Sequence, residues 1–312
     1  MRNTFVDTLC ELAATDERIW LLCGDLGYSV LERFSSRFPE RYLNMGVAEQ
    51  NMTGVATGLA LSGKIVFTYS IANFPVMRCL EQIRNDVCYH NATVKIVAVG
   101  GGLAYGTHGY THHGVEDLAV MRALPRMTVV APGDPVETRL ATQALAAQPG
   151  PGYLRLGKGG EPALYAAPPP FELGRALVLR AGADVTFVAT GAILGETLKA
   201  ADLLEDQGIR AGVVSMPTLK PLDAQAVLDV ASRSRWIVTV EEHSVLGGLG
   251  SAVAEVLTGV AALRARLLRL GVAMEPSVVG TQAYLRHLNG LDAERLAATV
   301  CEVAAAEGAS RA

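Results

Sequence analysis

The feature that most constrains the fold of this chain is a repeated alternation of short apolar runs with segments whose apolar residues have helical spacing. Apolar runs of strand length occur at Ile19–Cys23, Lys64–Tyr69 and Val94–Val99, and the segment Phe74–His90 has the spacing of a helix. Strands that alternate with helices of this length form parallel sheets covered on both faces. The sequence therefore predicts an α/β fold.

One stretch without periodicity divides the chain. Gly157–Pro170 contains three glycines and four prolines, which is the composition of a linker. Beyond it the alternation restarts with the apolar run Val185–Thr190. We therefore predict two consecutive doubly wound domains with mainly parallel sheets, at residues 1–160 and 173–312, joined by a linker at residues 161–172.

Composition limits the partners that this chain can bind. The net charge is −4 without a long basic run, so we predict no binding of nucleic acid or of an anionic membrane. The first residues lack the apolar run of a signal peptide, and later uncharged apolar runs stay below the length of about 18 residues that a membrane span needs. The five cysteines are scattered without a CxxC pair, which indicates reduced core residues of a cytoplasmic protein.

An acidic residue, Glu49, stands in the first turn of the helix expected at Ala48–Leu61. A carboxylate at this position ordinarily complements the helix dipole. The residues around it, Gly46–Gln50, read GVAEQ and give it a second interpretation.

The GVAEQ motif resembles the signature of the pyrimidine-binding domain of transketolase and 1-deoxyxylulose-5-phosphate synthase, which are thiamine-diphosphate enzymes. The resemblance implies a pyrimidine-binding domain followed by a transketolase C-terminal domain. It also implies that Glu49, with Gln50 beside it, binds the pyrimidine ring of the cofactor. A carboxyl group that shares a proton with a ring nitrogen favours the imino form of the cofactor, which can then take up the thiazolium C2 proton.

Three of the six histidines, His108, His112 and His113, lie within six positions of a glycine-rich loop. The glycines Gly100–Gly106 do not form a dinucleotide fingerprint, because no helix opens directly behind them. Such a histidine cluster is typical of a metal site or of proton-transfer chemistry. A metal is disfavoured because the loop has no cysteine, and adjacent His112 and His113 would need a contorted backbone to bind one ion.

For proton transfer, the loop resembles transketolase, in which the histidine after a threonine lines the substrate channel and contacts sugar hydroxyls. The resemblance assigns this role to His112. His108 stands where typical transketolases have an aspartate. We predict His112, together with His108 and His113, as catalytic residues.

The resemblance implies further cofactor contacts. An aromatic residue of the family stacks on the aminopyrimidine, and this role falls on Phe74, with Tyr69 as the weaker candidate. Asp25 matches a family residue near the cofactor.

Three positions fit the substrate phosphate contacts of the family, namely Arg2, Ser29 and Arg155. An arginine at a strand end is well shaped to bind phosphate, although a single arginine is ordinarily part of a salt bridge. A family histidine that also holds phosphate falls at Gly100 here. We therefore expect a phosphate site that lacks one donor.

Thiamine diphosphate needs Mg²⁺ on its diphosphate, which the family supplies from a separate amino-terminal domain with a Gly-Asp-Gly…Asn-Asn motif. This sequence does not contain that motif. The resemblance therefore implies the carboxy-terminal subunit of a split transketolase, which transfers a two-carbon ketol unit from a ketose to an aldose. It implies a separate diphosphate-binding subunit as partner, which supplies the Mg²⁺ ligands, and a homodimer of this chain within an α2β2 complex.

Other functions fit the same domain pair. The β subunit of a 2-oxo acid dehydrogenase also lacks the diphosphate domain, and a 1-deoxyxylulose-5-phosphate synthase-like activity is a further option. A scaffold subunit without turnover is the alternative from a different class. The sequence leaves open the ketose donor and aldose acceptor, whether they are phosphorylated, and the identity of the partner subunit.

Overall fold

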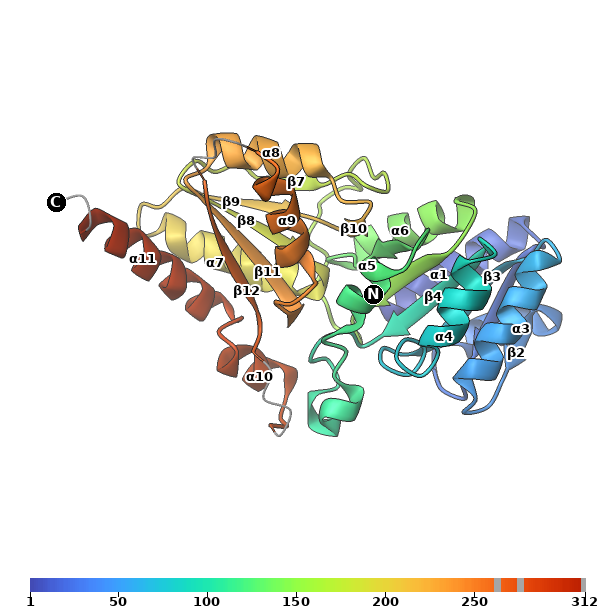
Figure 1. Cartoon of the computed structure of the whole chain (residues 1–312). Coiled ribbons are helices and arrows are strands. Elements are labelled where there is room, and N and C mark those ends of the chain that lie inside the picture. The colour runs from blue at the N-terminus through green and yellow to red at the C-terminus, as the bar shows by residue number, and fades with distance from the viewer. Residues whose placement is uncertain (261–264, 274–277, 310–312) are drawn as a thin grey trace.

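The computed structural model describes residues 1–260, 265–273 and 278–309, and these form two α/β units (Figure 1). The first sheet has seven strands in the order β10-β5-β6-β4-β3-β1-β2, and the second has five in the order β12-β11-β8-β9-β7. Most neighbouring strands run parallel, while β10 with β5 and β7 with β9 run antiparallel. The predicted α/β class, with two consecutive and mainly parallel sheets, is confirmed.

The first sheet and its helices occupy the amino-terminal half of the chain. Its own strands are β1 (Ile19–Cys23), β2 (Tyr42–Asn44), β3 (Ile65–Ile71), β4 (Val94–Val99), β5 (Thr128–Val130) and β6 (Gly152–Leu156). The helices are α1 (Arg2–Thr15), α2 (Glu32–Arg37), α3 (Glu49–Leu61), α4 (Leu80–Gln82), α5 (Asp117–Ala123) and α6 (Pro135–Ala147). Residues of α1, α2 and α6 join one core cluster and those of α3 and α5 another, so both faces of the sheet are covered.

The second sheet follows the same plan. Its strands are β7 (Leu177–Arg180), β8 (Val185–Thr190), β9 (Ala211–Ser215), β11 (Trp236–Ser244) and β12 (Arg266–Val272). The helices are α7 (Leu194–Glu205), α8 (Ala224–Arg233), α9 (Leu249–Thr258), α10 (Gln282–Leu288) and α11 (Ala293–Ala309). Asp223 accepts a hydrogen bond from Ala226 N at 3.0 Å and thereby caps the start of α8.

The division between the two sheets differs from the expectation in one respect. Strand β10 (Thr218–Lys220) belongs to the second half of the chain but pairs with β5 at the edge of the first sheet. Lys220 Nζ also donates to the carbonyl of Arg122 at 2.9 Å. A strand of three residues has no periodicity of its own, so its partner is set by the tertiary structure.

The expected helix Phe74–His90 is interrupted. The structure has turns up to Cys79, then α4, and then a π-helical turn at Ile83–Cys88. Pro75 disfavours helical backbone at the residue before it, which explains why Phe74 does not start a regular helix. The apolar spacing predicted the buried face correctly, since Val76, Ile83 and Val87 are fully buried.

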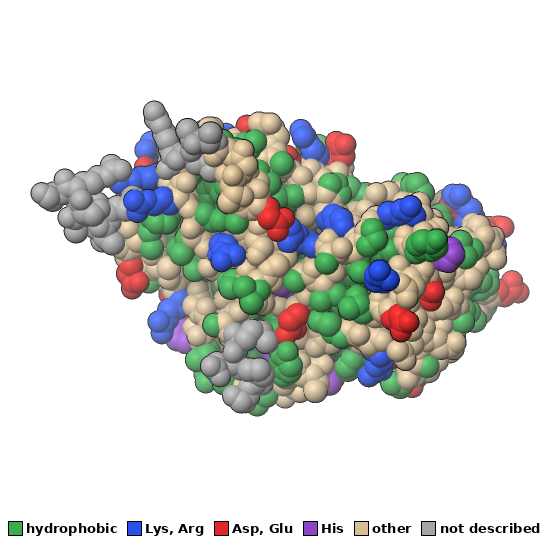
Figure 2. Space-filling model, in the orientation of Figure 1, with side chains coloured by type: hydrophobic (Ala, Val, Ile, Leu, Met, Phe, Trp, Pro, Cys, Tyr) green, Lys and Arg blue, Asp and Glu red, His purple; other side chains and the backbone are tan. Residues whose placement is uncertain are grey.

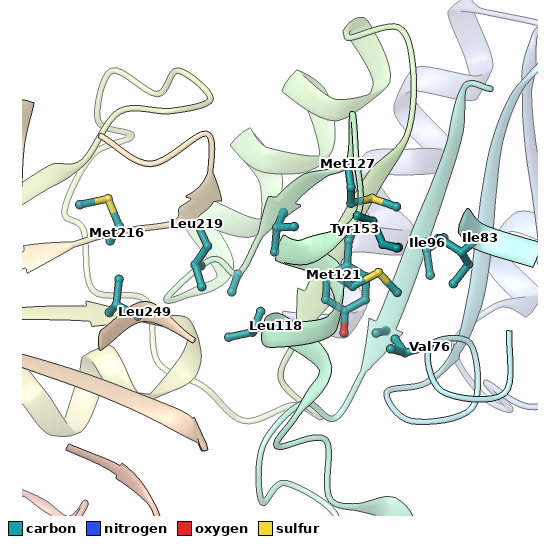
Figure 3. Packing of buried hydrophobic residues seen from close by; sticks show 14 of the residues in the cluster. Val76, Ile83, Ile96, Leu118, Met121, Met127, Tyr153, Met216, Leu219 and Leu249 are labelled. Carbon is teal, nitrogen blue, oxygen red and sulfur yellow. The ribbon is translucent and has the colours of Figure 1, made fainter. Parts of the chain in front are cut away.

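A single core cluster runs through both units. Figure 3 shows it passing from Ile83 and Ile96, beside the first sheet, through Leu118 and Met121 to Met216 and Leu249 of the second half. Burial of one Leu or Met side chain stabilises a fold by about 1.5–3 kcal/mol. The two units therefore share a continuous apolar interior.

The surface carries charges of both signs. Figure 2 shows lysine, arginine and acidic side chains scattered among apolar ones on this face, without an extended area of one sign. Within the described part of the chain, none of the helices combines the length and the apolar character needed to cross a membrane.

Lys95 is a buried cation in the centre of the first sheet. Its side chain is fully buried in β4, and Nζ donates to the carbonyls of Gln148 and Gly150 at 2.7 and 2.6 Å. Burial lowers the pKa of Lys95 from 10.5 to about 7, because desolvation disfavours the charged form. Lys95 thus links the end of α6 to the sheet, and its lowered pKa means that it loses its proton more readily than an exposed lysine does.

Replacing Lys95 by methionine should remove a pH dependence of stability. Between the folded pKa of about 7 and the unfolded value of 10.5, the unfolded chain holds the proton and the folded chain does not. Stability therefore rises with pH in this window, by about 1 kcal/mol per pH unit for the wild type relative to Lys95→Met. Urea unfolding between about pH 6.5 and 9.5 measures this difference. The exposed Lys199→Met is the control, and a pH-independent difference for Lys95→Met would contradict the prediction.

Candidate active site

The carboxylate of Glu49 lies buried at the start of α3, between the ends of β1 and β3. Its side chain is 1% exposed. Ser70 Oγ donates to Oε1 at 3.1 Å, and Arg78 Nη1 donates to Oε2 at 2.5 Å. Gly24 leaves room for the carboxylate, because a β-carbon at that position would lie 3.2 Å from Oε1.

The turn before α3 is held by a neighbouring strand end. Asn44 Oδ1 accepts from Gly46 N at 3.0 Å, and Gly46 has a φ of 69°. Such a left-handed backbone favours glycine, so the motif glycine allows the sharp entry into α3. Asn44 Nδ2 also donates to Asp25 Oδ1 at 2.9 Å. The loops that carry Asp25 and Glu49 are therefore joined through Asn44, which sequence reasoning missed.

A series of rings leads away from Glu49. The rings of Phe74 and His112 meet edge to face at 5.2 Å between centroids. His112 lies 4.9 Å from His108, whose ring meets Tyr105 at 5.5 Å. Arg78 joins Glu49 to the series, because its Cζ lies 5.1 Å from the centroid of Phe74. The structure thus brings together Glu49, Phe74, His112 and His108, and it adds Arg78.

The two adjacent histidines have different surroundings. Burial and the neighbouring His108 and His113 lower the pKa of His112, so its ring is neutral near pH 7 and can accept a proton. His113 is buried, and its Nε2 lies 3.1 Å from the carbonyl oxygen of Gly106. The expectation that His113 handles substrate protons does not fit this placement, since the ring braces its own loop.

The remaining predicted cofactor residues are dispersed. Tyr69 is 1% exposed and stacks on Phe5 at 6.1 Å, so it belongs to the core and not to an open cofactor face. This placement contradicts the weaker expectation for Tyr69, whose strand is buried on both faces. Gln50 is exposed on α3. Asp25 is exposed with a φ of 57°, a strained conformation for a residue other than glycine.

Two predicted phosphate residues lie at the same edge as Asp25. Ser29 is exposed with a φ of 62°, and its N–H donates to Glu32 Oε1 at 2.8 Å. Burial raises the pKa of Tyr105, and the nearby charge of Arg2 opposes this rise. Arg2 therefore lies close to the ring series. Its Nε is buried without a hydrogen-bond partner among the described residues.

Arg155, the third predicted phosphate residue, is buried between the two units. Its side chain is 5% exposed, and Nε donates to Asp117 Oδ2 at 2.8 Å. Nη2 donates to the carbonyls of Gly114 and Glu242 at 2.6 and 2.9 Å. The expectation that Arg155 binds a substrate phosphate does not fit this placement. Its Nε and Nη2 are engaged by residues far away in the sequence, which a strand-end pattern cannot reveal.

Close neighbours explain why the loop after β4 is rich in glycine. A β-carbon at Gly101 would lie 2.5 Å from Arg155 Nε, and one at Gly102 would lie 2.7 Å from Glu242 Oε1. Glu242 accepts from Leu103 N at 2.6 Å and from Arg286 Nε at 2.7 Å. The glycines therefore allow the loop to approach a buried network of charged side chains.

At Gly100 the structure shows what replaces the family histidine. A β-carbon there would lie 2.0 Å from the ring of Tyr105. Above the same ring lies Lys158 Nζ, 4.6 Å from the centroid. Lys158 is exposed, in contrast to Arg155 three residues earlier. Sequence reasoning missed Lys158, although a cation between glycines at a strand end was visible.

No group of three or more histidine, cysteine or acidic side chains suited to a metal ion occurs within residues 1–260, 265–273 and 278–309. The buried carboxylates have protein partners instead. Glu241, for example, accepts from the N–H groups of Leu249 and Gly250 at 2.7 and 2.8 Å, where α9 begins.

Comparison with known proteins decides the family. Residues 1–161 match the transketolase pyrimidine binding domain, and residues 174–296 match the transketolase C-terminal domain. The chain belongs to the transketolase family. The predicted resemblance is confirmed, and so is the order of the two domain types.

Individual proteins support this transketolase assignment. A putative transketolase C-terminal section from Methanocaldococcus jannaschii is 40% identical over 305 residues, covering 97% of this chain and 95% of that protein. 1-Deoxy-D-xylulose-5-phosphate synthase from Thermomicrobium roseum is 40% identical, covering 98% of this chain and 49% of that enzyme. A solved structure described as a split gene transketolase, inactive β4 tetramer, has a TM-score of 0.87, 41% identity and 96% coverage of both chains.

Removing the guanidinium of Arg155 should destabilise this transketolase-family chain strongly. Arg155→Met leaves the buried carboxylate of Asp117 without its counter-ion, and Asp117 Oδ1 already lacks a partner among the described residues. We expect a loss of about 3–5 kcal/mol in the free energy of unfolding. Guanidinium unfolding followed by circular dichroism measures it.

The matched control is Arg139→Met, because Arg139 forms an exposed ion pair with Glu11. We expect this variant to lose less than about 1 kcal/mol. Similar small losses in both variants would show that the Arg155 pair contributes nothing beyond a surface ion pair.

Proposed function

We propose that this chain is the carboxy-terminal subunit of a split transketolase, active only with a separate diphosphate-binding subunit. The observation that carries the proposal is the buried carboxylate of Glu49, linked through Arg78 to the half-buried ring of Phe74 and the neutral ring of His112. Relatives named as a C-terminal section and as a split gene transketolase, which this chain covers nearly end to end, support it.

The residues present fit the pyrimidine half of thiamine diphosphate. Glu49 would bind a ring nitrogen, and Phe74 would provide a flat apolar face for the ring. Asp25 and Gln50 would lie at the rim of the same site. When bound, thiamine diphosphate supplies the carbon nucleophile that attacks the ketose carbonyl and carries the two-carbon unit.

The side chains of this chain would then bind and transfer protons. Glu49, whose side chain is 1% exposed, would hold a proton between its carboxylate and a ring nitrogen of the cofactor. His112, neutral near pH 7, accepts a proton from a sugar hydroxyl, and His108 beside it positions the same substrate. His113 supports the backbone of this loop.

Exposed apolar residues around the site support the partner proposal. Tyr28 and Val47 are each 73% exposed, Tyr110 is 43% exposed and Met77 is 40% exposed. All four lie on the loops that carry the candidate residues. Exposed apolar and aromatic side chains that gather on one surface mark protein interfaces, in whose centre they become buried. We propose that the partner subunit covers them, supplies the Mg²⁺ ligands, and forms an α2β2 complex with a homodimer of this chain in the cytoplasm.

A reaction of the 1-deoxyxylulose-5-phosphate synthase type is the second candidate. This chain is 40% identical to such an enzyme over 98% of the chain and 49% of the enzyme, which favours this candidate. The two functions differ in their donors, because a transketolase uses a ketose and the synthase uses a 2-oxo acid.

Reconstitution tests the proposed function. The chain assembled with a diphosphate-binding subunit, thiamine diphosphate and Mg²⁺ should transfer a ketol unit from a ketose phosphate to an aldose, whereas the chain alone should not. Glu49→Gln in the same complex should slow hydrogen–deuterium exchange at the cofactor C2 by about 10²–10⁴-fold, as measured by NMR. Release of CO₂ from pyruvate, without ketol transfer, would favour the second candidate. Turnover by the purified chain alone would exclude a split enzyme.

Lys158 should replace Arg155 as the phosphate contact. A charge-assisted hydrogen bond to phosphate contributes about 1.5–3 kcal/mol, so Lys158→Met should raise KM for a phosphorylated acceptor about ten- to a hundredfold. KM for an unphosphorylated acceptor should change little. Lys199→Met, which removes an exposed lysine of α7, is the control. Equal increases for both acceptors would mean that Lys158 supports Tyr105 and does not bind phosphate.

A further inference from the structure

Both carboxylate oxygens of Glu49 have a hydrogen-bond partner within this chain. Ser70 occupies Oε1 and Arg78 occupies Oε2. Gly24 packs behind it so closely that a β-carbon would meet Oε1 at 3.2 Å. A ring nitrogen that binds Oε2 in the direction now used by Arg78 would therefore take the place of this guanidinium.

Arg78 is the partner that can move. Its side chain is 43% exposed, whereas Ser70 is fully buried within β3. Arg78 also lies in the irregular turn between Pro75 and α4, so regular helical packing does not restrain it. Arg78 has access to water, so its guanidinium can leave the carboxylate for solvent if an incoming donor takes its place and keeps buried Glu49 paired.

The same guanidinium touches the second group of the proposed cofactor site. Its central carbon lies 5.1 Å from the centroid of the Phe74 ring. A guanidinium and an aminopyrimidine are both planar, both carry N–H donors and both bind aromatic faces. Arg78 therefore makes the two contacts, to carboxylate and to ring, that the pyrimidine of the cofactor would make.

We propose that Arg78 is an internal occupant of the pyrimidine site, which the cofactor displaces on binding. This proposal rests on the proposed function. The ion pair requires a charged Glu49, whereas the bound ring requires a carboxyl that shares its proton. Arg78 thus keeps Glu49 in an ion pair until the cofactor binds. The apparent affinity for the cofactor is then the intrinsic affinity multiplied by the fraction of sites that Arg78 leaves open.

Cofactor affinity tests this proposal without reference to turnover. Thiamine diphosphate with Mg²⁺ is titrated calorimetrically into the complex of this chain with its diphosphate-binding subunit. Arg78→Met should bind the cofactor about fivefold more tightly than the wild type, because the competing occupant is gone. Arg78→Lys keeps the charge but loses the planar fork, and it should fall between the two.

The matched control is Arg84→Met, which removes an exposed arginine of the neighbouring π turn that bonds to Asn85. Its affinity should equal that of the wild type. If Arg78→Met fails to fold by circular dichroism, tighter binding by Arg78→Lys supports the proposal and unchanged or weaker binding overturns it.

Equal or weaker binding by folded Arg78→Met, with a wild type that binds, overturns the Arg78 proposal and leaves the proposed function standing. A wild-type complex that takes up no thiamine diphosphate refutes the proposed function, and the Arg78 proposal fails with it.

Discussion

The buried ion pair between Arg155 and Asp117 is the interaction on which the arrangement of the site depends. Arg155 is the penultimate residue of β6, and its partner Asp117 begins α5. The same guanidinium binds the carbonyls of Gly114 and Glu242. One side chain therefore holds the first sheet, the end of the histidine loop and β11 of the second sheet. Two buried charges are costly to desolvate, and the three hydrogen bonds of Nε and Nη2 offset part of this cost.

The position of the candidate site follows from the parallel first sheet. Strands β1, β3 and β4 end at the same edge, and the loops that leave them carry Asp25, Phe74 and His112. Ligands of open parallel sheets bind at such carboxyl edges, because the loops of neighbouring strands meet there. Asn73 Nδ2 donates to the carbonyl of His113 at 2.7 Å and holds two of these loops together.

Charge pairing distinguishes the two arginines that matter here. Arg155 is buried and stabilises the fold through its ion pair with Asp117. Arg78 is partly exposed and binds Glu49, the carboxylate that we propose as the cofactor contact. A guanidinium that reaches water can be exchanged for another donor, whereas one enclosed by protein acceptors cannot leave them without losing those bonds. The same contrast supports the proposal that exposed Lys158, which lies over the ring of Tyr105, binds phosphate in place of Arg155.

The sequence by itself determined the alternating architecture and the family, and it singled out Glu49, Phe74 and His112 as candidates, because periodicity and short motifs are local properties. Only the tertiary structure decided that Arg155 is enclosed, that Arg78 reaches Glu49, and that β10 crosses to the first sheet. These contacts join residues 29 to 91 positions apart. The residue type at one position does not reveal which distant residues bury it or pair with it. The partners of a charged side chain and of a short strand are therefore set by the fold.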